Sequence, residues 1–210
     1  MINNLISRYP QLAPIKADIE KAVTILKECY YLCGKVLLMG NGGSASDCEH
    51  IAGELLKGFM LKRPMTEDER VLFEMAFPED SEKFAKTLQR GIPAISLPSQ
   101  IGVLSAYAND VEPDMVYAQL VFAYNQIGDV AVGLSTSGNS KNVVNGLKVA
   151  RALGLKTVAF TGAKPCLLDE FCSVVIKVPE TETYKVQELH LAVYHAICAE
   201  IEKELFGDNE

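Results

Sequence analysis

The 210-residue sequence lacks several features that would assign it to a particular class of protein. No run reaches the roughly 18 apolar residues of a membrane span, and residues 1–16 carry no signal-peptide core. Positive charge is scarce, and the formal net charge of -7 gives no general attraction to nucleic acid or anionic lipid. The six cysteines form no CxxC pair, which favours free thiols in a reducing compartment. We therefore expect a cytoplasmic protein with no nucleic-acid and no membrane partner.

Motifs for nucleotide binding are also missing. The glycine-rich segment from Gly40 to Ser44 is neither GxGxxG nor a P-loop with its Gly-Lys-Ser/Thr ending. No internal repeat or low-complexity segment divides the chain, and 49% hydrophobic residues supply a sizeable core. The sequence predicts one domain over residues 1–210 and no nucleotide cofactor.

Short apolar runs alternate with helical patterns along most of the chain. An apolar stripe after Pro14 predicts a long helix that ends at Gly34, so residues 1–34 form an N-terminal helical segment. Strands are expected at residues 35–39, 93–97, 129–134, 156–160 and 172–178, and further helices at 45–59, 141–153 and 184–206. This alternation predicts an α/β fold with a parallel sheet covered by helices on both faces.

Residues 61–91 do not fit this alternation. The stretch is charged, reads as helix at 67–76 and 81–89, and is interrupted by Pro78. It is expected to be a helical insertion between two strands of the sheet. Its role stays open between a lid, a contact with another subunit and surface decoration, since surface loops tolerate insertions at low thermodynamic cost.

Six small polar residues follow one of the predicted strands: Ser135, Thr136, Ser137, Gly138, Asn139 and Ser140. At the carboxyl end of a parallel strand they would meet the free amides and positive dipole end of the next helix. Short hydroxyl donors and a glycine that permits close approach suit a phosphate group. The alternative is an ordinary turn and helix cap. The segment from Gly40 to Ser44 is expected at the same edge of the sheet.

Two of the three histidines can be given a chemical role. His50 and Glu54 are four residues apart on one predicted helix, so they share a face. On the closing helix, Gln187 and His195 differ by about 12 Å of rise and ~80° of rotation. These side chains could bind a divalent metal or act as acid and base. His190 lies about 140° from His195 and is expected to be structural or at an interface.

Taken together and in order, these motifs resemble phosphoheptose isomerases, a group of SIS-domain (sugar isomerase) proteins. The resemblance covers nearly the whole chain except residues 61–91. It implies a three-layer fold with a five-stranded parallel sheet, assembled as a homotetramer whose active sites lie at subunit interfaces.

The resemblance also implies a role for each matching residue. Glu54 would be the base that moves a proton between C1 and C2 of a sugar phosphate through an enediol, and His195 its acid partner. Zinc would be held by His50, Glu54, Gln187 and His195. The substrate would be bound by Asn41, Gly42, Gly43, Ser44, Asn109, Asp110, Ser135, Thr136, Ser137, Ser140 and Gln187.

The chain departs from the family pattern near the sugar. Where many members have Gly-Arg after the glutamate, this chain has Leu55-Leu56-Lys57-Gly58, and Tyr184 replaces a frequent acidic residue. These departures keep the phosphosugar class and leave the exact sugar open. Sedoheptulose 7-phosphate is the expected substrate. The alternative function is a non-catalytic SIS module, either a phosphosugar sensor or an adaptor of the kind that associates with the replication initiator DnaA.

Overall fold

The computed structural model describes residues 1–207 and is built around a parallel sheet of five strands in the order β2-β1-β3-β4-β5. The strands are β1 (Val36–Gly40), β2 (Ala94–Ser96), β3 (Val130–Leu134), β4 (Lys156–Thr161) and β5 (Val174–Lys177). Every residue of β1 and β3 is buried, which is the burial pattern of central strands covered on both faces.

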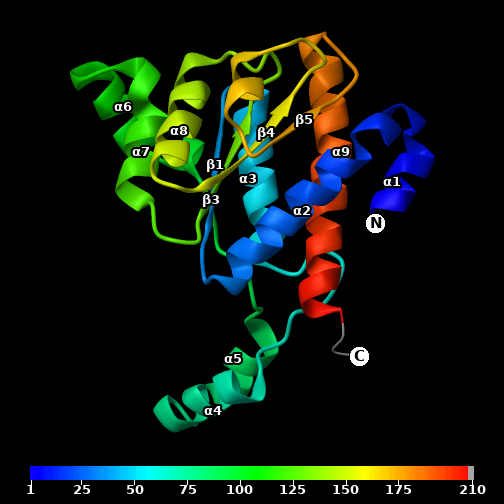
Figure 1. Cartoon of the computed structure of the whole chain (residues 1–210). Coiled ribbons are helices and arrows are strands. Elements are labelled where there is room, and N and C mark those ends of the chain that lie inside the picture. The colour runs from blue at the N-terminus through cyan, green and yellow to red at the C-terminus, as the bar shows by residue number, and fades with distance from the viewer. Residues whose placement is uncertain (208–210) are drawn as a thin grey trace.

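Helices cover both faces of the sheet (Figure 1). On one face pack α2 (Lys16–Tyr31), α3 (Gly43–Leu56) and α9 (Thr183–Phe206), with α1 (Ile2–Arg8) against α9. On the other lie α7 (Val116–Tyr124) and α8 (Lys141–Ala152), bordered by α6 (Ile101–Asp110). Side chains alternate between the two cores, because Leu38 points into the first and Leu37 and Met39 into the second. This three-layer arrangement confirms the predicted fold class.

Short 3₁₀ helices connect some of these elements: Pro10–Ile15, Leu97–Ser99, Pro113–Met115 and Leu167–Glu170. The first of them corrects the predicted start of the N-terminal helix. Pro14 lies inside the 3₁₀ turn, and α2 begins only at Lys16. The helix predicted at 45–59 begins two residues earlier, at Gly43, and ends three residues earlier, at Leu56. Helix α1 lies within the predicted N-terminal helical segment, residues 1–34, although it was not predicted as a separate helix, and helices α6 and α7 were not among the predicted elements.

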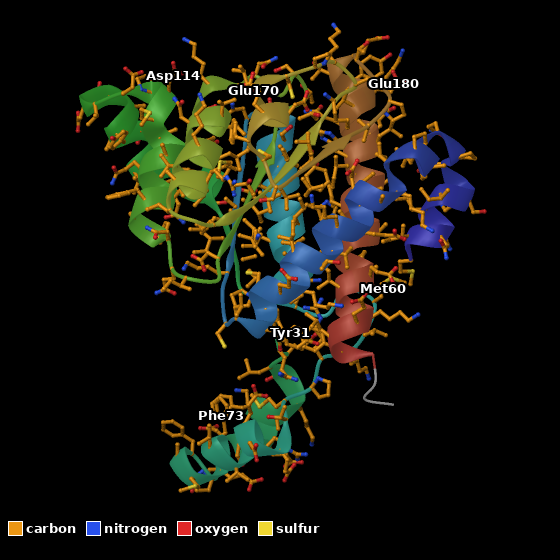
Figure 2. The ribbon with its side chains drawn as sticks, in the orientation of Figure 1. Tyr31, Met60, Phe73, Asp114, Glu170 and Glu180 are labelled. Atoms are coloured by element: carbon orange, nitrogen blue, oxygen red, sulfur yellow. The ribbon has the colours of Figure 1, made fainter. Side chains whose placement is uncertain are left out.

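Residues 61–91 contain a helical hairpin of α4 (Glu67–Ala76) and α5 (Ser81–Thr87), so both predicted helices are present and the second is two residues shorter. The hairpin projects away from the sheet and its covering helices (Figures 1 and 2). Neither helix has a buried residue, and the two meet through Phe73 and Phe84, whose ring centroids are 5.4 Å apart. A capping box between Thr66 and Glu69 starts α4.

The carboxyl ends of the strands face one edge of the molecule, where Asp114, Glu170 and Glu180 are labelled in Figure 2. The opposite edge leads to the hairpin. None of the helices in residues 1–207 is long and apolar enough to cross a membrane. All six cysteines are free thiols, as the sequence predicted.

Candidate functional site

The sheet has its topological switch point between β1 and β3. From β1 the chain continues to β2 on one side, whereas β3, β4 and β5 follow on the other. Ligands of open α/β sheets bind outside the carboxyl ends of the strands at this point. Both polar loops singled out in the sequence leave the sheet here, since Gly40 ends β1 opposite Leu134, which ends β3. The expectation that they share one edge is confirmed.

Side-chain hydrogen bonds tie the two loops together. Asn41 and Asn142 exchange two bonds, with Nδ2–Oδ1 distances of 2.8 and 3.0 Å. The hydroxyl of Tyr117, on α7, donates to the carbonyl of Gly40 at 2.5 Å. Burial raises the pKa of Tyr117 to about 12, so its hydroxyl stays a donor at neutral pH. Neither Asn142 nor Tyr117 was identified from the sequence, because only the fold brings them beside Asn41.

The loop from Ser135 to Ser140 forms a closed turn at the start of α8. Ser135 is buried, and its Oγ lies 3.0 Å from Ser140 Oγ, while Ser137 and Asn139 are exposed. Gly138 has φ +67°, and a Cβ there would collide with the Cys166 side chain. Thr136 anchors the turn through its carbonyl, which accepts the Gly162 amide at 3.0 Å. The result is a pair of adjacent hydroxyls, those of Ser135 and Ser140, at the N-terminus of α8, an arrangement suited to an anion.

The loop after β1 presents bare backbone to the same edge. Gly42 has φ +56°, with nothing within 4 Å of the position a Cβ would take. At Gly43, the first residue of α3, a Cβ would come within 2.7 Å of Gln187 Nε2. Ser44 is buried against this turn. Gln187 of α9 therefore lies at the first turn of α3, where only glycine leaves room for it.

Two turns further along both helices, His50, Glu54 and His195 come together. One ligand atom from each lies within 4.8 Å of the others, and these are the side chains in the described residues that could share a metal ion. His50 Nε2 is 3.2 Å from Glu54 Oε1 and 3.3 Å from His195 Nε2. Burial, followed by the neighbouring His50, lowers the pKa of His195, and Glu54 raises it to a smaller extent. His195 is therefore a neutral imidazole at neutral pH.

The remaining predicted residues lie apart from this cluster. His190 is buried and its Nε2 donates to the Thr161 carbonyl at 3.3 Å, in agreement with a structural role. Asn109 and Asp110 end α6; both are exposed, and Asn109 Nδ2 donates to Asp110 Oδ1 at 2.8 Å. Their roles in substrate binding stay predictions, as does that of Gln187 as a ligand.

A buried ion pair supports the cluster from behind and was not foreseen. Arg63 donates to Glu202 Oε1 at 2.8 Å, to the Leu55 carbonyl at 2.6 Å and to the Glu54 carbonyl at 3.0 Å. Burial raises the pKa of Glu202, but amide hydrogen bonds from Phe59 and Met60, and then Arg63, bring it below its ordinary value. The pair fixes the last turn of α3, which carries Glu54.

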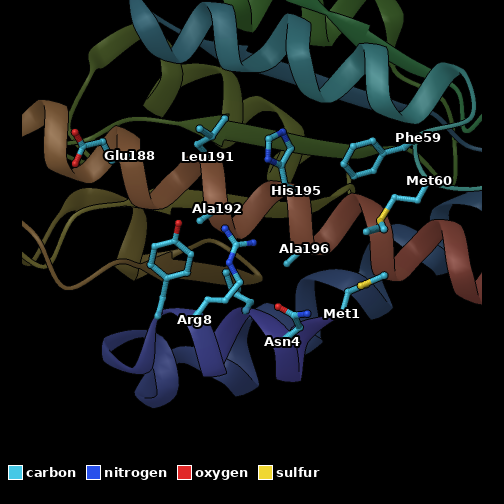
Figure 3. A pocket seen from close by; sticks show the side chains of 13 residues that line it. Met1, Asn4, Arg8, Phe59, Met60, Glu188, Leu191, Ala192, His195 and Ala196 are labelled. Carbon is cyan, nitrogen blue, oxygen red and sulfur yellow. The ribbon is translucent and has the colours of Figure 1, made fainter.

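A pocket of about 360 Å³ opens on the other side of His195, between α1 and α9. In Figure 3 the His195 ring projects from α9 toward α3 beside Phe59, and Arg8 of α1 reaches up to the α9 surface. Glu188 and Met60 also line this space. His195 thus contacts His50 and also lines an open cavity, so it is accessible from outside the protein core.

The donor set fits a zinc-type cation. Two imidazole nitrogens and one carboxylate are the ligands of many catalytic zinc sites, which keep a further position for water or substrate. Glu54 Oε2 is buried and has no hydrogen-bond partner among the described residues, so it offers a free acceptor. Without a cation, the same residues form a histidine–carboxylate group that can hold and move a proton.

Comparisons with known proteins agree with this geometry. A family model described as SIS domain matches residues 3–94 and 83–162. Phosphoheptose isomerase of Aliarcobacter butzleri is 38% identical over 191 residues, which cover 91% of this chain and 87% of the relative. Phosphoheptose isomerase of Maridesulfovibrio salexigens is 35% identical over 200 residues, which cover 95% of this chain and 83% of the relative. The structure of phosphoheptose isomerase GmhA from Neisseria gonorrhoeae superposes with a TM-score of 0.67 at 28% identity, covering 95% of this chain and 98% of the other.

Proposed function

The chain belongs to the phosphoheptose isomerases of the SIS-domain family and is a sugar-phosphate isomerase, and we propose that its reaction interconverts sedoheptulose 7-phosphate and D-glycero-D-manno-heptose 7-phosphate. This proposal rests on the position of the cluster of His50, Glu54 and His195. The cluster lies further along α3 than the polar loop that precedes this helix, and that loop meets the loop from Ser135 to Ser140 at the sheet edge. Gly43 and His50 are about 10 Å apart along the helix. An extended seven-carbon sugar phosphate can span from one to the other.

The substrate phosphate is held by the loop after β3. Ser135, Thr136, Ser137 and Ser140 supply hydroxyls, and the N-terminus of α8 supplies a positive dipole end. Asn41, Gly42, Gly43 and Ser44, with Asn109 and Asp110, bind the sugar hydroxyls. No Lys or Arg belongs to this set, in keeping with the acidic composition of the chain.

Glu54 is the base that moves the proton between C1 and C2. Its free Oε2 can accept a proton, while Oε1 stays beside His50. His195, neutral at rest, exchanges a proton with the sugar oxygen as the enediol forms and collapses. The ion pair of Arg63 and Glu202 holds the backbone carbonyl of Glu54, so the carboxylate keeps its position through the cycle.

Zinc would be held by His50, Glu54 and His195, with Gln187 as the fourth ligand. When bound, it would supply Lewis-acid polarisation of the sugar carbonyl oxygen. Gln187 lies about 12 Å from His195 along α9. We propose that the chains assemble as a cytoplasmic homotetramer whose sites lie at subunit interfaces, where groups from a neighbouring subunit could complete the ligand set.

The test is turnover of sedoheptulose 7-phosphate by purified protein with and without added zinc, beside Glu54→Gln. Loss of the carboxylate base should lower kcat by about 10²–10⁴-fold. Glu28→Gln is the matched control, since Glu28 is an exposed glutamate on α2, away from the site. Equal turnover in both variants would reject Glu54 as the base. No turnover in the wild type, with phosphosugar binding retained, would point to another sugar or to the non-catalytic sensor.

A further inference from the structure

Tyr194 holds the ring nitrogen of His50 that faces away from the cluster. Tyr194 precedes His195 on α9 and is 1% exposed. Its hydroxyl oxygen lies 2.9 Å from His50 Nδ1 and 3.2 Å from Asp47 Oδ1. Asp47 is on α3, one turn before His50, so the hydroxyl bridges two residues of one helix from the neighbouring helix. Neither Tyr194 nor Asp47 belongs to the set of residues assigned to the reaction above.

Counting protons fixes the direction of these hydrogen bonds. A carboxylate only accepts, so Tyr194 must donate its single hydroxyl proton to Asp47. The tyrosine oxygen can then only accept from His50, and the proton of the imidazole must sit on Nδ1. The opposite tautomer would point the lone pairs of Tyr194 and Asp47 at each other.

This tautomer leaves the Nε2 lone pair of His50 directed into the cluster. Glu54 Oε1 and His195 Nε2 lie 3.2 and 3.3 Å from that nitrogen. The His50 Nε2 lone pair and the Glu54 carboxylate are both acceptors, and two acceptors 3.2 Å apart favour a cation between them. Metal-binding histidines typically depend on a hydrogen bond from the other ring nitrogen, which fixes the tautomer and the ring orientation.

We propose that Tyr194, oriented by Asp47, is a positioning residue that fixes His50 with its Nε2 free to bind the metal ion. This inference rests on the proposed metal site and extends it to the side chains behind the ligands. The Tyr194 ring also packs edge-on against both histidines, with centroids 5.5 Å from His50 and 5.0 Å from His195. Replacing tyrosine by phenylalanine keeps that packing and removes only the hydroxyl.

The test measures zinc affinity of the full chain by competition with a chelator, in the absence of sugar. Tyr194→Phe should bind zinc about 10–100-fold more weakly than the wild type, the range found for lost outer partners of ligands. Tyr30→Phe is the matched control. Tyr30 also accepts a side-chain hydrogen bond, from Arg90 at 3.0 Å, but it lies on α2. The zinc affinity of Tyr30→Phe should equal that of the wild type.

Asp47→Ala gives a second route to the same result. Without its acceptor, Tyr194 can donate to His50 Nδ1 and move the imidazole proton to Nε2, so zinc binding should weaken to a similar degree. Because both changes break one chain of hydrogen bonds, the double variant should lose little more than either single one. The visible absorption of the Co²⁺-loaded protein should shift in Tyr194→Phe and stay unchanged in Tyr30→Phe.

Unchanged zinc affinity in Tyr194→Phe, with a wild type that binds zinc and turns over substrate, would overturn this inference alone. Additive losses in the double variant would also overturn it, because they would show two independent effects. A wild type that binds no zinc would overturn both the metal site and the inference, so the two failures are distinguishable.

Discussion

His190 makes the stability of this protein dependent on pH. Its ring is fully buried, Nε2 donates to the Thr161 carbonyl, and Nδ1 has no partner among the described residues. Burial lowers the pKa of His190 from 6.5 to about 4. Above pH 6.5 the ring is neutral in both the folded and the unfolded state, so it does not change the free energy of unfolding with pH. As pH falls from 6.5 towards 4, the unfolded chain binds the proton first, and stability is lost.

We expect the wild type to lose about 3 kcal/mol of unfolding free energy over this range through His190. His190→Gln has no such titration, so urea unfolding of both proteins at pH 7.5, 6, 5 and 4 isolates the effect. The difference in stability between them should move by that amount in favour of the glutamine variant as pH falls. A difference that stays constant with pH would show that His190 is not buried in the neutral form.

Most of the residues proposed for chemistry could be found in the sequence, but their supporting partners could not. The small polar loop after a strand and the His50–Glu54 spacing are local patterns, and the structure places both at the predicted edge or face. Tyr194 and Asp47 are joined across two helices 147 residues apart in sequence. Such a contact depends on how α3 and α9 are rotated against each other, which no local pattern specifies.

At the scale of elements, prediction succeeded where a short apolar run ended in polar loop residues. All five strands were found, with boundaries within two residues. Helix α7 was missed because five of its nine residues are buried and it has little polar face to reveal its period. Helix α6 was missed for the opposite reason, since it has no buried residue and exposes apolar side chains.

The turn after α3 depends on the buried ion pair of Arg63 and Glu202. Glu202 accepts amides from Phe59, Met60 and Leu61 in addition to Arg63. Arg63→Met would leave this carboxylate buried without a cation and would remove the side-chain donor of the Glu54 carbonyl, while the Leu55 carbonyl would keep only the Ile92 amide. We expect a loss of about 3–5 kcal/mol in the free energy of unfolding, measured in urea.

Arg70→Met is the matched control for this change. Arg70 forms an exposed pair with Glu67 at 3.7 Å on the projecting hairpin, with half of its side chain in solvent. Its loss should change stability by less than about 0.5 kcal/mol. Similar effects of the two substitutions would mean that the buried pair contributes nothing beyond a surface ion pair.

At the scale of the whole molecule, the sheet order determines which loops meet. Parallel strands ending at one edge could be predicted from alternating elements, but the adjacency of β1 and β3 could not, because β2 intervenes in sequence. Their pairing places Asn41 against Asn142 and completes the site edge. The hairpin α4–α5 lies at the edge opposite the carboxyl ends of the strands, so it does not cover the switch point in this conformation (Figure 1).

Helix α6 exposes the surface on which we expect subunits to meet. Ile101 is 74% exposed and Val111 63%, and Val103, Ala106 and Val111 line a shallow groove that begins one residue after Ile101. Contiguous exposed apolar side chains of this kind mark interaction sites. Asn109 and Asp110, proposed to bind sugar, end the same helix. A neighbour covering α6 would enclose them, as expected for sites at subunit interfaces.

If the chain forms the proposed homotetramer through α6, Ile101→Glu should reduce the mass in solution from that of four chains to that of a smaller assembly, because a charge would be buried in the contact. Turnover of sedoheptulose 7-phosphate should fall with it if sites need two subunits. Ile127→Glu is the control, since Ile127 is 100% exposed in the turn before β3 and does not belong to α6. Light scattering after size exclusion gives both masses. A four-chain mass in Ile101→Glu would place the contact elsewhere, whereas dissociation with full turnover would show that each chain holds a complete site.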